Sequence, residues 1–468
     1  MRLLHVGSGF RPLRQGGLVA YTEDLMHEQL RRGHEVTYFF AGRHYPLVGG
    51  PRLRRWLYEG VAMLEVVNSP LYDHGRQPEL ELGEPRLERM FARILAEARP
   101  DVVHVHELAG LPTSLLDVVR EAGAPCVFTL QDYFPLCSTF KLLDHEGRVC
   151  LRREIGSDCA ATVAARKVPP GVLTDVTLRH EILVRPLLRA LDPHPPHARV
   201  SRLVRAVANR VPAPPPAPPD AYQRRREVNL ERLNRVDLLI AMSDRVGEIY
   251  ALLGVQPERL RTVQLTLGHI ERLTPRTIAA RTPVTFGALN VLSDDSKGAR
   301  PLVDAARLVA AEAPGSFRLV VHGLVADHLR AEAEAVDAIE LCGPYWPNQV
   351  DSLLDDIDVG LVPSIWEEAY GYVGVEFLAK GIPVIANAIG GMTDYTRDGE
   401  TGWLNRSLSA EELARIMLEI VREPQQVTEH NAWILANRDS IVKTVAAHTD
   451  EMDAIYGELL GEREGAAA

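Results

Sequence analysis

Residues 366–387, WEEAYGYVGVEFLAKGIPVIAN, combine an acidic loop, a predicted helix and an apolar strand in one short segment. Two glutamates, Glu368 and Glu376, lie on either side of Gly371, and the stretch ends in an apolar run that follows a Gly-Ile-Pro turn. The preceding segment, residues 358–364, is another apolar run that ends in a loop. This pattern predicts strand, acidic loop, helix and strand, which is the order of an α/β domain that binds ligand at the carboxyl ends of its strands.

Both glutamates are placed to reach one ligand in such a domain. Glu368 would lie just before the helix, where its carboxylate can accept hydrogen bonds from sugar hydroxyls. Glu376 would follow one or two helical turns later and reach the same ligand from the helix side. Two glutamates at this spacing more often lie on the solvated face of a surface helix. The pair therefore indicates a ligand site only together with the residues around it.

The same alternation of strand and helix extends outward over both halves of the chain. Residues 1–130 alternate apolar strands with amphipathic helices, and a second series begins near Pro283. Such alternation predicts parallel sheets with helices on both faces. The pattern breaks down over about residues 135–220, which hold three cysteines and the proline-rich run 211–219. We interpret this segment as an irregular insertion in the first domain, because its proline density favours extended, helix-free structure.

Composition sets the broad class. A chain of 468 residues is long enough for two domains, and 46% apolar with 25% charged residues is typical of soluble globular proteins. The net charge of −11 argues against nucleic acid as a partner. We expect no membrane span, because no apolar run approaches about 20 residues. The first residues enter a strand without a signal-peptide pattern, and five cysteines suggest no disulfide framework, so we expect a cytoplasmic protein.

The residues around the glutamate pair resemble the donor site of the retaining glycosyltransferases of family 4. The matching positions are Pro363, Ser364, Glu368, Gly371, Glu376, the GIPV of residues 381–384, the GG of residues 390–391 and the DGETG of residues 398–402. The resemblance covers nearly the whole chain apart from the insertion. It implies the GT-B fold, in which two Rossmann-like α/β domains with parallel sheets face a central cleft.

The resemblance also implies the domain boundaries and the division of labour. Residues 1–275 would form an N-terminal domain that binds the acceptor, and residues 282–435 would form the C-terminal domain that binds a nucleotide-sugar donor. Residues 436–468 would form a terminal helix that crosses back to the first domain.

In the donor domain, the resemblance gives five residues a role. Glu376 would accept hydrogen bonds from the ribose, and Glu368 would hold the hydroxyls of the sugar ring. Lys297 would neutralise the diphosphate, on which charge builds as the glycosidic bond breaks. Backbone N–H groups at Gly371 and Tyr372 would assist it.

One departure from the family pattern lies beside Lys297. The family usually has an arginine directly after the glycine of the preceding strand, whereas residues 287–290 of this chain are GALN. Asn290 or Arg300 would have to take over the contact with the donor diphosphate.

The first domain carries a second set of candidates. The pair Gly16 and Gly17 opens a predicted helix whose N–H groups favour an anionic group, the donor diphosphate or the acceptor by resemblance, although a simple turn would use the same glycines. His106 matches the family histidine that faces the transferred sugar across the cleft. Gln131, where the family commonly has histidine, and Asp132 end a strand and could contact the acceptor or cap a loop.

Metal sites find little support in the sequence. His104 and His106 would share one strand face, but no carboxylate or cysteine lies at a supporting spacing, and family 4 enzymes need no metal. Cys137, Cys150 and Cys159, with a histidine between them, could bind zinc, yet they lack a close C-x2-C pair, which favours free thiols. The basic segment 199–210 could form an amphipathic helix that docks on a membrane or, by the simpler interpretation, covers the rim of the cleft.

We therefore predict a bacterial, retaining, nucleotide-sugar-dependent hexosyltransferase of glycan or natural-product biosynthesis. Its acceptor would be a hydroxyl of a small molecule or of a lipid-linked glycan precursor, and peripheral contact with the inner membrane face is left open. No cofactor or metal is expected. Two alternatives stay open: a catalytically silent GT-B partner or activator, which the missing arginine and Gln131 keep in play, and another GT-B enzyme such as a nucleotide-sugar epimerase or a phosphorylase.

Overall fold

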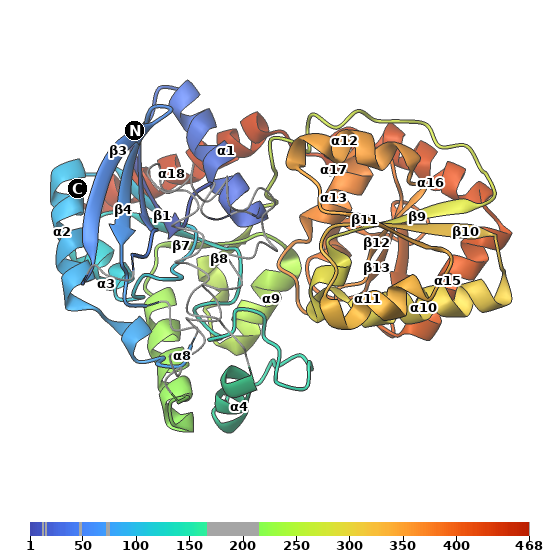
Figure 1. Cartoon of the computed structure of the whole chain (residues 1–468). Helices are drawn as coiled ribbons and strands as arrows, with labels where there is room; N and C mark the ends of the chain where they lie inside the picture. Colours follow the sequence, from blue (N-terminus) through green and yellow to red (C-terminus); the bar gives the residue numbers. More distant parts are fainter. Residues whose placement is uncertain (12–13, 15, 46–48, 72–74, 166–214, 468) are drawn as a thin grey trace, which may run out of the picture. The chain divides into compact units, whose positions relative to one another are not determined.

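The computed structural model of the protein (Figure 1) describes residues 1–11, 14, 16–45, 49–71, 75–165 and 215–467. The predicted basic helix at 199–210 and the start of the proline-rich run lie outside the described residues. The chain divides into two compact units. Unit 1 comprises Met1–Ala241, Ile249–Arg261 and Thr449–Ala468, and unit 2 comprises Met242–Glu248 and Thr262–His448.

Unit 1 is an α/β unit built on an eight-stranded sheet. Its elements in chain order are β1 (Arg2–Ser8), α1 (Gly17–Arg31), β2 (Glu35–Ala41), β3 (Arg52–Tyr58), β4 (Val61–Val67), η1 (Leu80–Leu82), α2 (Pro85–Ala98), β5 (Val102–Val105), α3 (Leu115–Glu121), β6 (Cys126–Leu130), α4 (Ser157–Ala165), α8 (Pro219–Leu233), β7 (Leu238–Ala241), the later part of α9 (Asp244–Leu253), η2 (Pro257–Arg259), β8 (Leu260–Thr262) and most of α18 (Val445–Ala467). The strand order is β3-β4-β2-β1-β5-β6-β7-β8. Strands β4, β2, β1, β5, β6 and β7 pair in parallel, and β3 is antiparallel to β4.

Unit 2 is a second α/β unit with a six-stranded, fully parallel sheet. Its elements are β9 (Val284–Leu289), η3 (Val291–Ser293), η4 (Asp295–Lys297), α10 (Ala299–Glu312), β10 (Phe317–His322), α11 (Asp327–Glu334), β11 (Ile339–Gly343), η5 (Pro347–Gln349), α12 (Val350–Leu353), η6 (Leu354–Asp356), β12 (Val359–Val362), α13 (Tyr372–Ala379), β13 (Val384–Asn387), α14 (Met392–Tyr395), β14 (Gly402–Asn405), α15 (Ala410–Arg422), α16 (Gln425–Ala436) and α17 (Arg438–Ile441). The strand order is β11-β10-β9-β12-β13-β14. Two α/β units with mainly parallel sheets confirm the predicted fold class.

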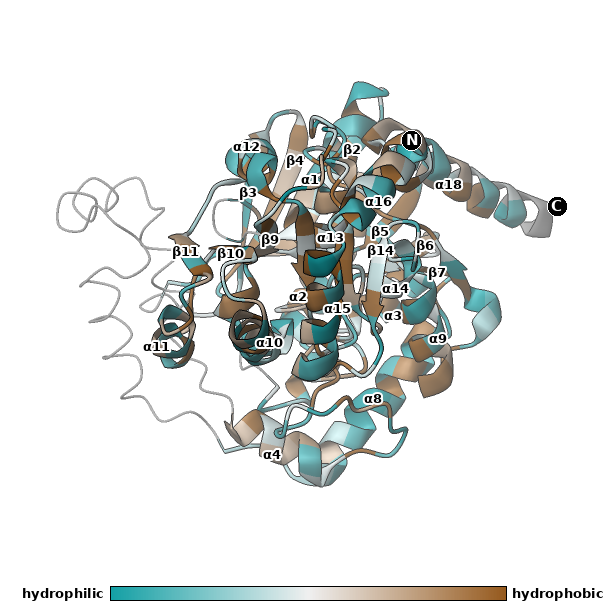
Figure 2. Cartoon of the chain, turned by 90° about the vertical axis from the view of Figure 1, so that its right-hand side faces the viewer, coloured by the Kyte–Doolittle hydropathy of each residue, from teal (hydrophilic) through white to brown (hydrophobic). Residues whose placement is uncertain are grey.

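Strands buried on both faces explain why the sequence contains unbroken apolar runs. All six residues of β9 are buried, as expected for a parallel sheet covered by helices on both sides. The covering helices are amphipathic: α15 carries both hydrophilic and hydrophobic residues in Figure 2, and Leu413, Ile416 and Ile420 among the latter are buried. In this way each unit has its own hydrophobic core.

A glycine sets how closely α13 packs on the sheet. A Cβ atom at Gly360 of β12 would lie 2.3 Å from Cδ2 of Phe377, a buried residue of α13. Because only glycine allows this approach, α13 packs closely against β12.

Both sheets reverse their strand order once, and each reversal brings two loops together. In unit 2 the chain runs outward from β9 to β11 and returns to place β12 beside β9; in unit 1 the reversal lies between β1 and β5. Ligands of open α/β sheets bind at this point, outside the carboxyl ends of the strands. The candidate residues of each unit lie after these strands.

Several local features differ from the sequence-based expectation. The hairpin of β3 and β4 was not predicted, because the sequence RLRRWLY of β3 has no clean alternation; its exposed arginines suit an edge strand. The insertion contains a helix, α4, and the C-terminal helix begins at Val445, nine residues after the start of the predicted segment 436–468. All five cysteines are free. Over the described part of the chain, no helix has the length and apolar character needed to cross a bilayer.

Candidate active site

Lys297 and Glu368 meet at the carboxyl edge of the unit 2 sheet. Lys297 ends η4 in the loop after β9, and Glu368 lies in the loop after β12, so the strand reversal brings them together. Lys297 Nζ donates a hydrogen bond to Glu368 Oε1, and Ser364 Oγ donates to Glu368 Oε2 at 2.6 Å. Lys297 also lies over the ring of Trp366, 5.8 Å from its centroid. The side chains of Lys297 and Glu368 are 33% and 14% exposed, so both are open to a ligand.

A glycine pair holds the Glu368 loop from behind. The N–H of Gly391 donates to the carbonyl of Glu368 at 2.7 Å, and the N–H of Gly390 donates to the carboxylate of Glu367 at 2.9 Å. A Cβ atom at Gly390 would lie 2.5 Å from the backbone N and O of Glu368. The GG of residues 390–391 is therefore required for the close approach of the two loops.

The N-terminus of α13 lies in the same loop. Gly371 precedes the helix with a φ of 77°, in the left-handed region that favours glycine, and Tyr372 is the first helical residue. The first N–H groups of a helix have no partner within the helix and favour an anionic ligand. This end of α13 can therefore receive negative charge beside Lys297.

Glu376 lies further along α13 and has a partner that the sequence did not reveal. His269 Nε2 is 2.7 Å from Glu376 Oε1, and the Glu376 side chain is 10% exposed. His269 belongs to an irregular segment before β9 and is separated from Glu376 by 107 residues, so no local pattern predicts the contact. The pair orients one oxygen of the carboxylate.

Asn290 connects the end of β9 to the surroundings of Glu376. It adopts a left-handed conformation with a φ of 56°, and its amide Nδ2 donates to Tyr345 Oη at 2.8 Å. Burial, and then the charge of Glu376, raise the pKa of Tyr345 above its ordinary value. Arg300, the other residue expected to replace the missing family arginine, instead pairs with Glu332 of α11 at 2.8 Å. Lys297 thus carries the positive charge beside Glu368.

In unit 1, His106 lies directly after β5 and is almost fully buried. Its N–H donates to the carbonyl of Val6 at 2.8 Å, and its ring meets Tyr21 of α1 edge-on, with centroids 5.7 Å apart. Helix α1 begins at Gly17, as predicted, and Gly16 precedes it with a φ of 126°. A Cβ atom at Gly16 would meet no described atom within 4 Å, so backbone conformation rather than space requires glycine there.

Gln131 and Asp132 follow β6 but differ in their contacts. Gln131 is 8% exposed, and among the described residues neither its amide nitrogen nor its amide oxygen has a hydrogen-bond partner. Asp132 Oδ1 accepts from the N–H of Phe134 at 2.8 Å, which is the loop-capping role. Burial, and then the nearby Glu107, raise the pKa of Asp132 to about 7. Gln131 therefore has the free polar capacity of a ligand contact, whereas Asp132 already holds its own loop.

Next to them lies an ion pair that the sequence analysis missed. Arg14 donates two hydrogen bonds to Glu107, at 2.5 Å and 2.8 Å. The Glu107 side chain is 1% exposed. Arg14 lies in the loop after β1, and Glu107 follows β5. The pair therefore joins the two loops at the point where the strand order of this sheet reverses, as Lys297 and Glu368 do in unit 2.

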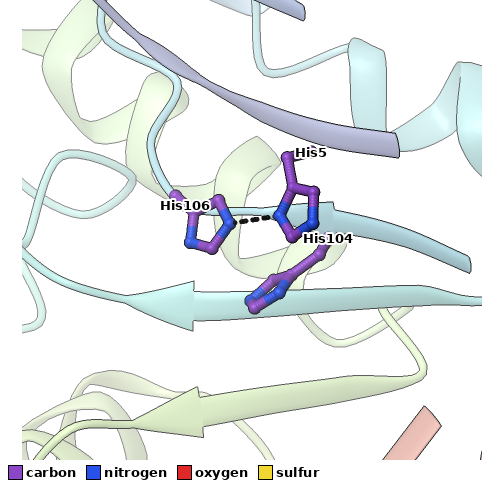
Figure 3. A group of neighbouring side chains, drawn as sticks. All are labelled: His5, His104 and His106. Atoms are coloured by element: carbon purple, nitrogen blue, oxygen red, sulfur yellow. Dashed lines mark hydrogen bonds between the residues drawn. The ribbon is translucent and has the colours of Figure 1, made fainter. Parts of the chain in front are cut away.

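Three buried histidines lie close together (Figure 3): His5 of β1, His104 of β5, and His106, which follows β5. His5 lies opposite His104 in the parallel register of β1 and β5, which the sequence analysis did not consider. Hydrogen bonds of 2.7–2.8 Å hold both inner rings: His5 bonds Gln29 and His106, and His104 bonds Tyr456 and Thr129. Of these bonds, Figure 3 draws the one between His5 and His106. A metal ion would have to displace these bonds, so the cluster is better described as a hydrogen-bonded group.

The cysteines of the insertion do not form a comparable group. Over the described residues, the ligand atoms of Cys137, Cys150 and Cys159 do not lie within 4.8 Å of one another as those of the three histidines do. Cys137 Sγ is 3.2 Å from Thr139 Oγ1, and burial raises the pKa of Cys159 to about 11. Burial therefore favours a protonated thiol at Cys159.

Two family models match this chain. Residues 15–265, more than half of its length, match the model described as Glycosyltransferase Family 4. Residues 281–423 match the model described as Glycosyl transferases group 1. The two models between them cover most of the described part of both units.

Curated relatives match over shorter segments. WcaL of Salmonella typhimurium, provisionally assigned as a colanic acid biosynthesis glycosyltransferase, is 28% identical over 198 residues, which are 40% of this chain and 48% of that protein. The D-inositol 3-phosphate glycosyltransferase of Rhodococcus opacus is 33% identical over 135 residues, 26% of this chain and 30% of that protein. The chain thus spans about half the length of the first relative and less than a third of the second.

Solved structures resemble the chain over almost its whole length. HepE of Anabaena in complex with UDP-glucose has a TM-score of 0.60 at 14% identity and covers 98% of this chain and 100% of its own. The trehalose-6-phosphate synthase OtsA has a TM-score of 0.61 at 11% identity, with coverages of 98% and 99%. At such identities the likeness establishes the fold, GT-B, and nothing about substrates. Since a family model matches more than half of its length, the chain belongs to glycosyltransferase family 4.

Proposed function

We propose that the protein is a retaining glycosyltransferase that moves a sugar from a nucleotide-sugar donor to a hydroxyl group of a small molecule or a glycan precursor. The observation that carries the proposal is the meeting of Lys297 with Glu368 beside the N-terminus of α13, at the strand reversal of unit 2. A nucleotide sugar requires a cation and a helix N-terminus for its diphosphate, and a carboxylate that accepts hydrogen bonds from the hydroxyls of its sugar.

The contacts suggest how a donor would be held. The diphosphate would lie between Lys297 and the first N–H groups of α13. Lys297 would then pair with the diphosphate instead of with Glu368. Glu368, still oriented by Ser364, would then accept from hydroxyls of the sugar. Glu376, whose carboxylate His269 orients, would accept from the ribose.

The chemistry of the step follows from the charges. As the glycosidic bond breaks, negative charge grows on the leaving phosphate, and Lys297 stabilises it without a metal ion. The leaving phosphate would take the proton of the acceptor hydroxyl, which attacks on the same face of the sugar. No carboxylate then has to act as the nucleophile of a double displacement, and the configuration at the anomeric carbon is retained.

The comparisons support this choice within limits. HepE is described in complex with UDP, with UDP-glucose, and with UDP and glucose, and the Rhodococcus opacus relative is named D-inositol 3-phosphate glycosyltransferase. These names support a nucleotide sugar as donor and a polar hydroxyl compound as acceptor class. The free thiols support a reducing cytoplasmic setting, with membrane contact required only if the acceptor is lipid-linked.

Donor turnover tests the proposal. The protein is incubated with UDP-, GDP-, dTDP- and ADP-glucose, and release of the nucleoside diphosphate is followed with and without candidate acceptors. We expect release from one donor, and loss of at least a hundredfold in Glu368→Gln and Lys297→Met, since each removes a group acting on the developing charge. The anomer that is formed first, measured by NMR, should keep the configuration of the donor.

The alternative of a silent GT-B partner has two sequence observations in its favour, the missing arginine next to Asn290 and Gln131 at the position where the family commonly has histidine. In that case the protein would release no diphosphate from any donor. An epimerase would instead give free sugar or an epimerised nucleotide sugar without any acceptor, and a phosphorylase would require inorganic phosphate.

A further inference from the structure

Helix α2 and strand β3 form an outer surface of unit 1 that is rich in arginine, although the whole chain has a net charge of −11. Strand β3 is at the edge of the sheet, and Figure 1 shows α2 running beside it. Glu97 near the end of α2 accepts a hydrogen bond from Arg55 of β3 at 2.7 Å, and Arg86 at its start lies close to Gly50, two residues before β3. We call this the α2–β3 surface.

Three exposed arginines lie on one side of α2. Arg86, Arg89 and Arg93 follow one another at intervals of three and four residues, the spacing that places side chains on one helix face. Leu87 and Phe91 of the same helix are buried in the core. Among the described residues, no acidic side chain pairs with any of the three arginines. Their positive charges are therefore open to an external partner.

Strand β3 adds two more such charges. Arg52 and Arg54 are exposed, and neither has an acidic partner in the part of the chain that the structure describes. The guanidinium of Arg54 lies over the ring of Trp56, 5.4 Å from its centroid. Arg55 is the exception in this strand, because it pairs with Glu97. Together with the three of α2, five exposed arginines of the α2–β3 surface are not neutralised by a described acid.

Two acids close to these arginines have other partners. Glu88 of α2 accepts a hydrogen bond from Ser114, the residue before α3. Glu65 lies opposite Arg54 in the register of β3 and β4, but its side chain is fully buried and pairs with Arg43. The positive potential of the surface therefore extends into solvent over roughly 8 Å, the Debye length at physiological salt.

The end of β3 adds an exposed apolar group. Leu57 is 72% exposed and Tyr58 is 38% exposed, at the turn between β3 and β4. Leu57 is two residues from Arg55, so its side chain is on the same face of the sheet, the face on which Arg55 meets α2. Arginines that bind anionic headgroups, next to an apolar side chain that enters the acyl boundary, are the composition of a surface that lies on a membrane.

We propose that the α2–β3 surface docks unit 1 on a bilayer of anionic lipids. The guanidinium groups would bind headgroup phosphates, which they can contact through two parallel N–H bonds, and Leu57 would enter between the headgroups. The proposal concerns binding alone and does not rest on the proposed transfer of a sugar.

Two other partners fit the surface less well. A second copy of the chain could pair with the edge strand β3, but the same arginines would then face one another across the interface, and like charges directly opposite are destabilising. Nucleic acid supplies phosphates, but it offers no apolar surroundings for Leu57.

Sedimentation of the full chain with lipid vesicles tests the proposal. We expect binding to vesicles of phosphatidylcholine mixed with phosphatidylglycerol, no binding to phosphatidylcholine alone, and weaker binding as salt is added. Replacement of Arg86, Arg89 and Arg93 together by Gln should lower the binding constant by roughly a hundredfold. Leu57→Ser should lower it by about tenfold, because less apolar area enters the bilayer.

A matched control removes the same charge from unit 2. Arg307, Arg330 and Arg422 are also exposed, but each pairs with an acid, and their joint replacement by Gln should leave vesicle binding unchanged. Equal loss of binding in the two triple variants would show an effect of net charge and overturn the proposal. Absence of wild-type binding to the anionic vesicles, or tighter binding to a DNA duplex than to them, would also overturn it.

Hydrogen exchange of wild type needs no variant. With anionic vesicles, peptides from α2 and β3 should gain protection from exchange, whereas peptides from α10 should not. Protection that spares α2 and β3 would place the contact elsewhere and contradict the proposal. Donor turnover is measured without vesicles, so a failure to bind lipid and a failure to transfer sugar are told apart.

Discussion

Glu367 and Glu368 are adjacent in sequence and have opposite surroundings. Glu367 is buried and accepts from Arg245 at 2.5 Å and from the N–H of Gly390 at 2.9 Å. Glu368 is open to ligand and bonds Lys297 and Ser364. Glu367 therefore holds the loop in place, and the loop presents Glu368 to a ligand.

Matched substitutions separate the two roles. We predict that Glu367→Gln lowers the free energy of unfolding by about 1–3 kcal/mol, because Arg245 loses its buried charged partner and keeps only the exposed Glu248. Glu368→Gln should change stability by less than about 1 kcal/mol and abolish donor turnover. Urea unfolding and diphosphate release measure both effects. Equal losses of stability in the two variants would contradict the assignment.

Asp132 gives the molecule a pH dependence whose sign can be worked out. Its pKa is raised from about 4 to about 7 by burial, so the folded protein keeps a proton that the unfolded chain releases. Between these values the folded state loses stability as pH rises, and the loss is complete above pH 7. Asp132→Asn removes this loss and keeps an oxygen for the N–H of Phe134.

We therefore predict that Asp132→Asn is more stable than wild type at pH 8, by about 4 kcal/mol at most, and equal to it near pH 4. Urea unfolding of both proteins at pH 4, 6 and 8 measures the difference. A difference that is the same at all three pH values would show that Asp132 is not protonated in the folded protein.

At the scale of elements, the loops that carry the unit 2 site depend on glycine. Gly390 and Gly399 both have positive φ, of 62° and 79°. A Cβ atom at Gly390 would collide with the backbone of Glu368, whereas one at Gly399 would meet no described atom within 4 Å. Alanine at either position would strain the backbone, but only alanine at Gly390 would also clash with neighbouring atoms. Comparing the two substitutions therefore separates the energy of backbone strain from that of the clash.

We predict that Gly399→Ala destabilises by about 1 kcal/mol and leaves turnover intact, because only the left-handed conformation is penalised. Gly390→Ala should cost about 2–4 kcal/mol and reduce turnover by more than tenfold, since the Glu368 loop must move. Unfolding midpoints and initial rates of both variants are compared with wild type. Similar behaviour of the two would mean that the loop tolerates displacement.

The elements also show what the sequence could predict. Buried strands and amphipathic helices have strong periodic patterns, so the two α/β units and the loop of Glu368 followed from sequence. The edge strand β3 has no such pattern, because none of its residues is fully buried and most are exposed. His269, His5 and the Arg14–Glu107 pair were missed because each contact joins distant segments, and spacing along the chain carries no information about them.

Across the whole molecule, the two units share the same arrangement of strands and of an ion pair between loops. Each has a parallel sheet whose strand order reverses once, and in each an ion pair joins the two loops at the reversal: Arg14 with Glu107, and Lys297 with Glu368. The carboxyl ends of the strands place these groups, as expected for open α/β sheets. The family models match both units, which fits this repeated arrangement.

Unit 2 is proposed to bind a nucleotide through Glu376, and thermal unfolding with added nucleotide measures this binding without any acceptor. Wild type and Glu376→Ala are heated with UDP, GDP, dTDP or ADP at a hundred times the expected Kd. Binding at this excess stabilises by about 2.7 kcal/mol, a shift of a few degrees in Tm. We predict that one nucleotide shifts wild type and not Glu376→Ala. No shift with any nucleotide, or an equal shift in the variant, would show that unit 2 does not bind a nucleotide through Glu376.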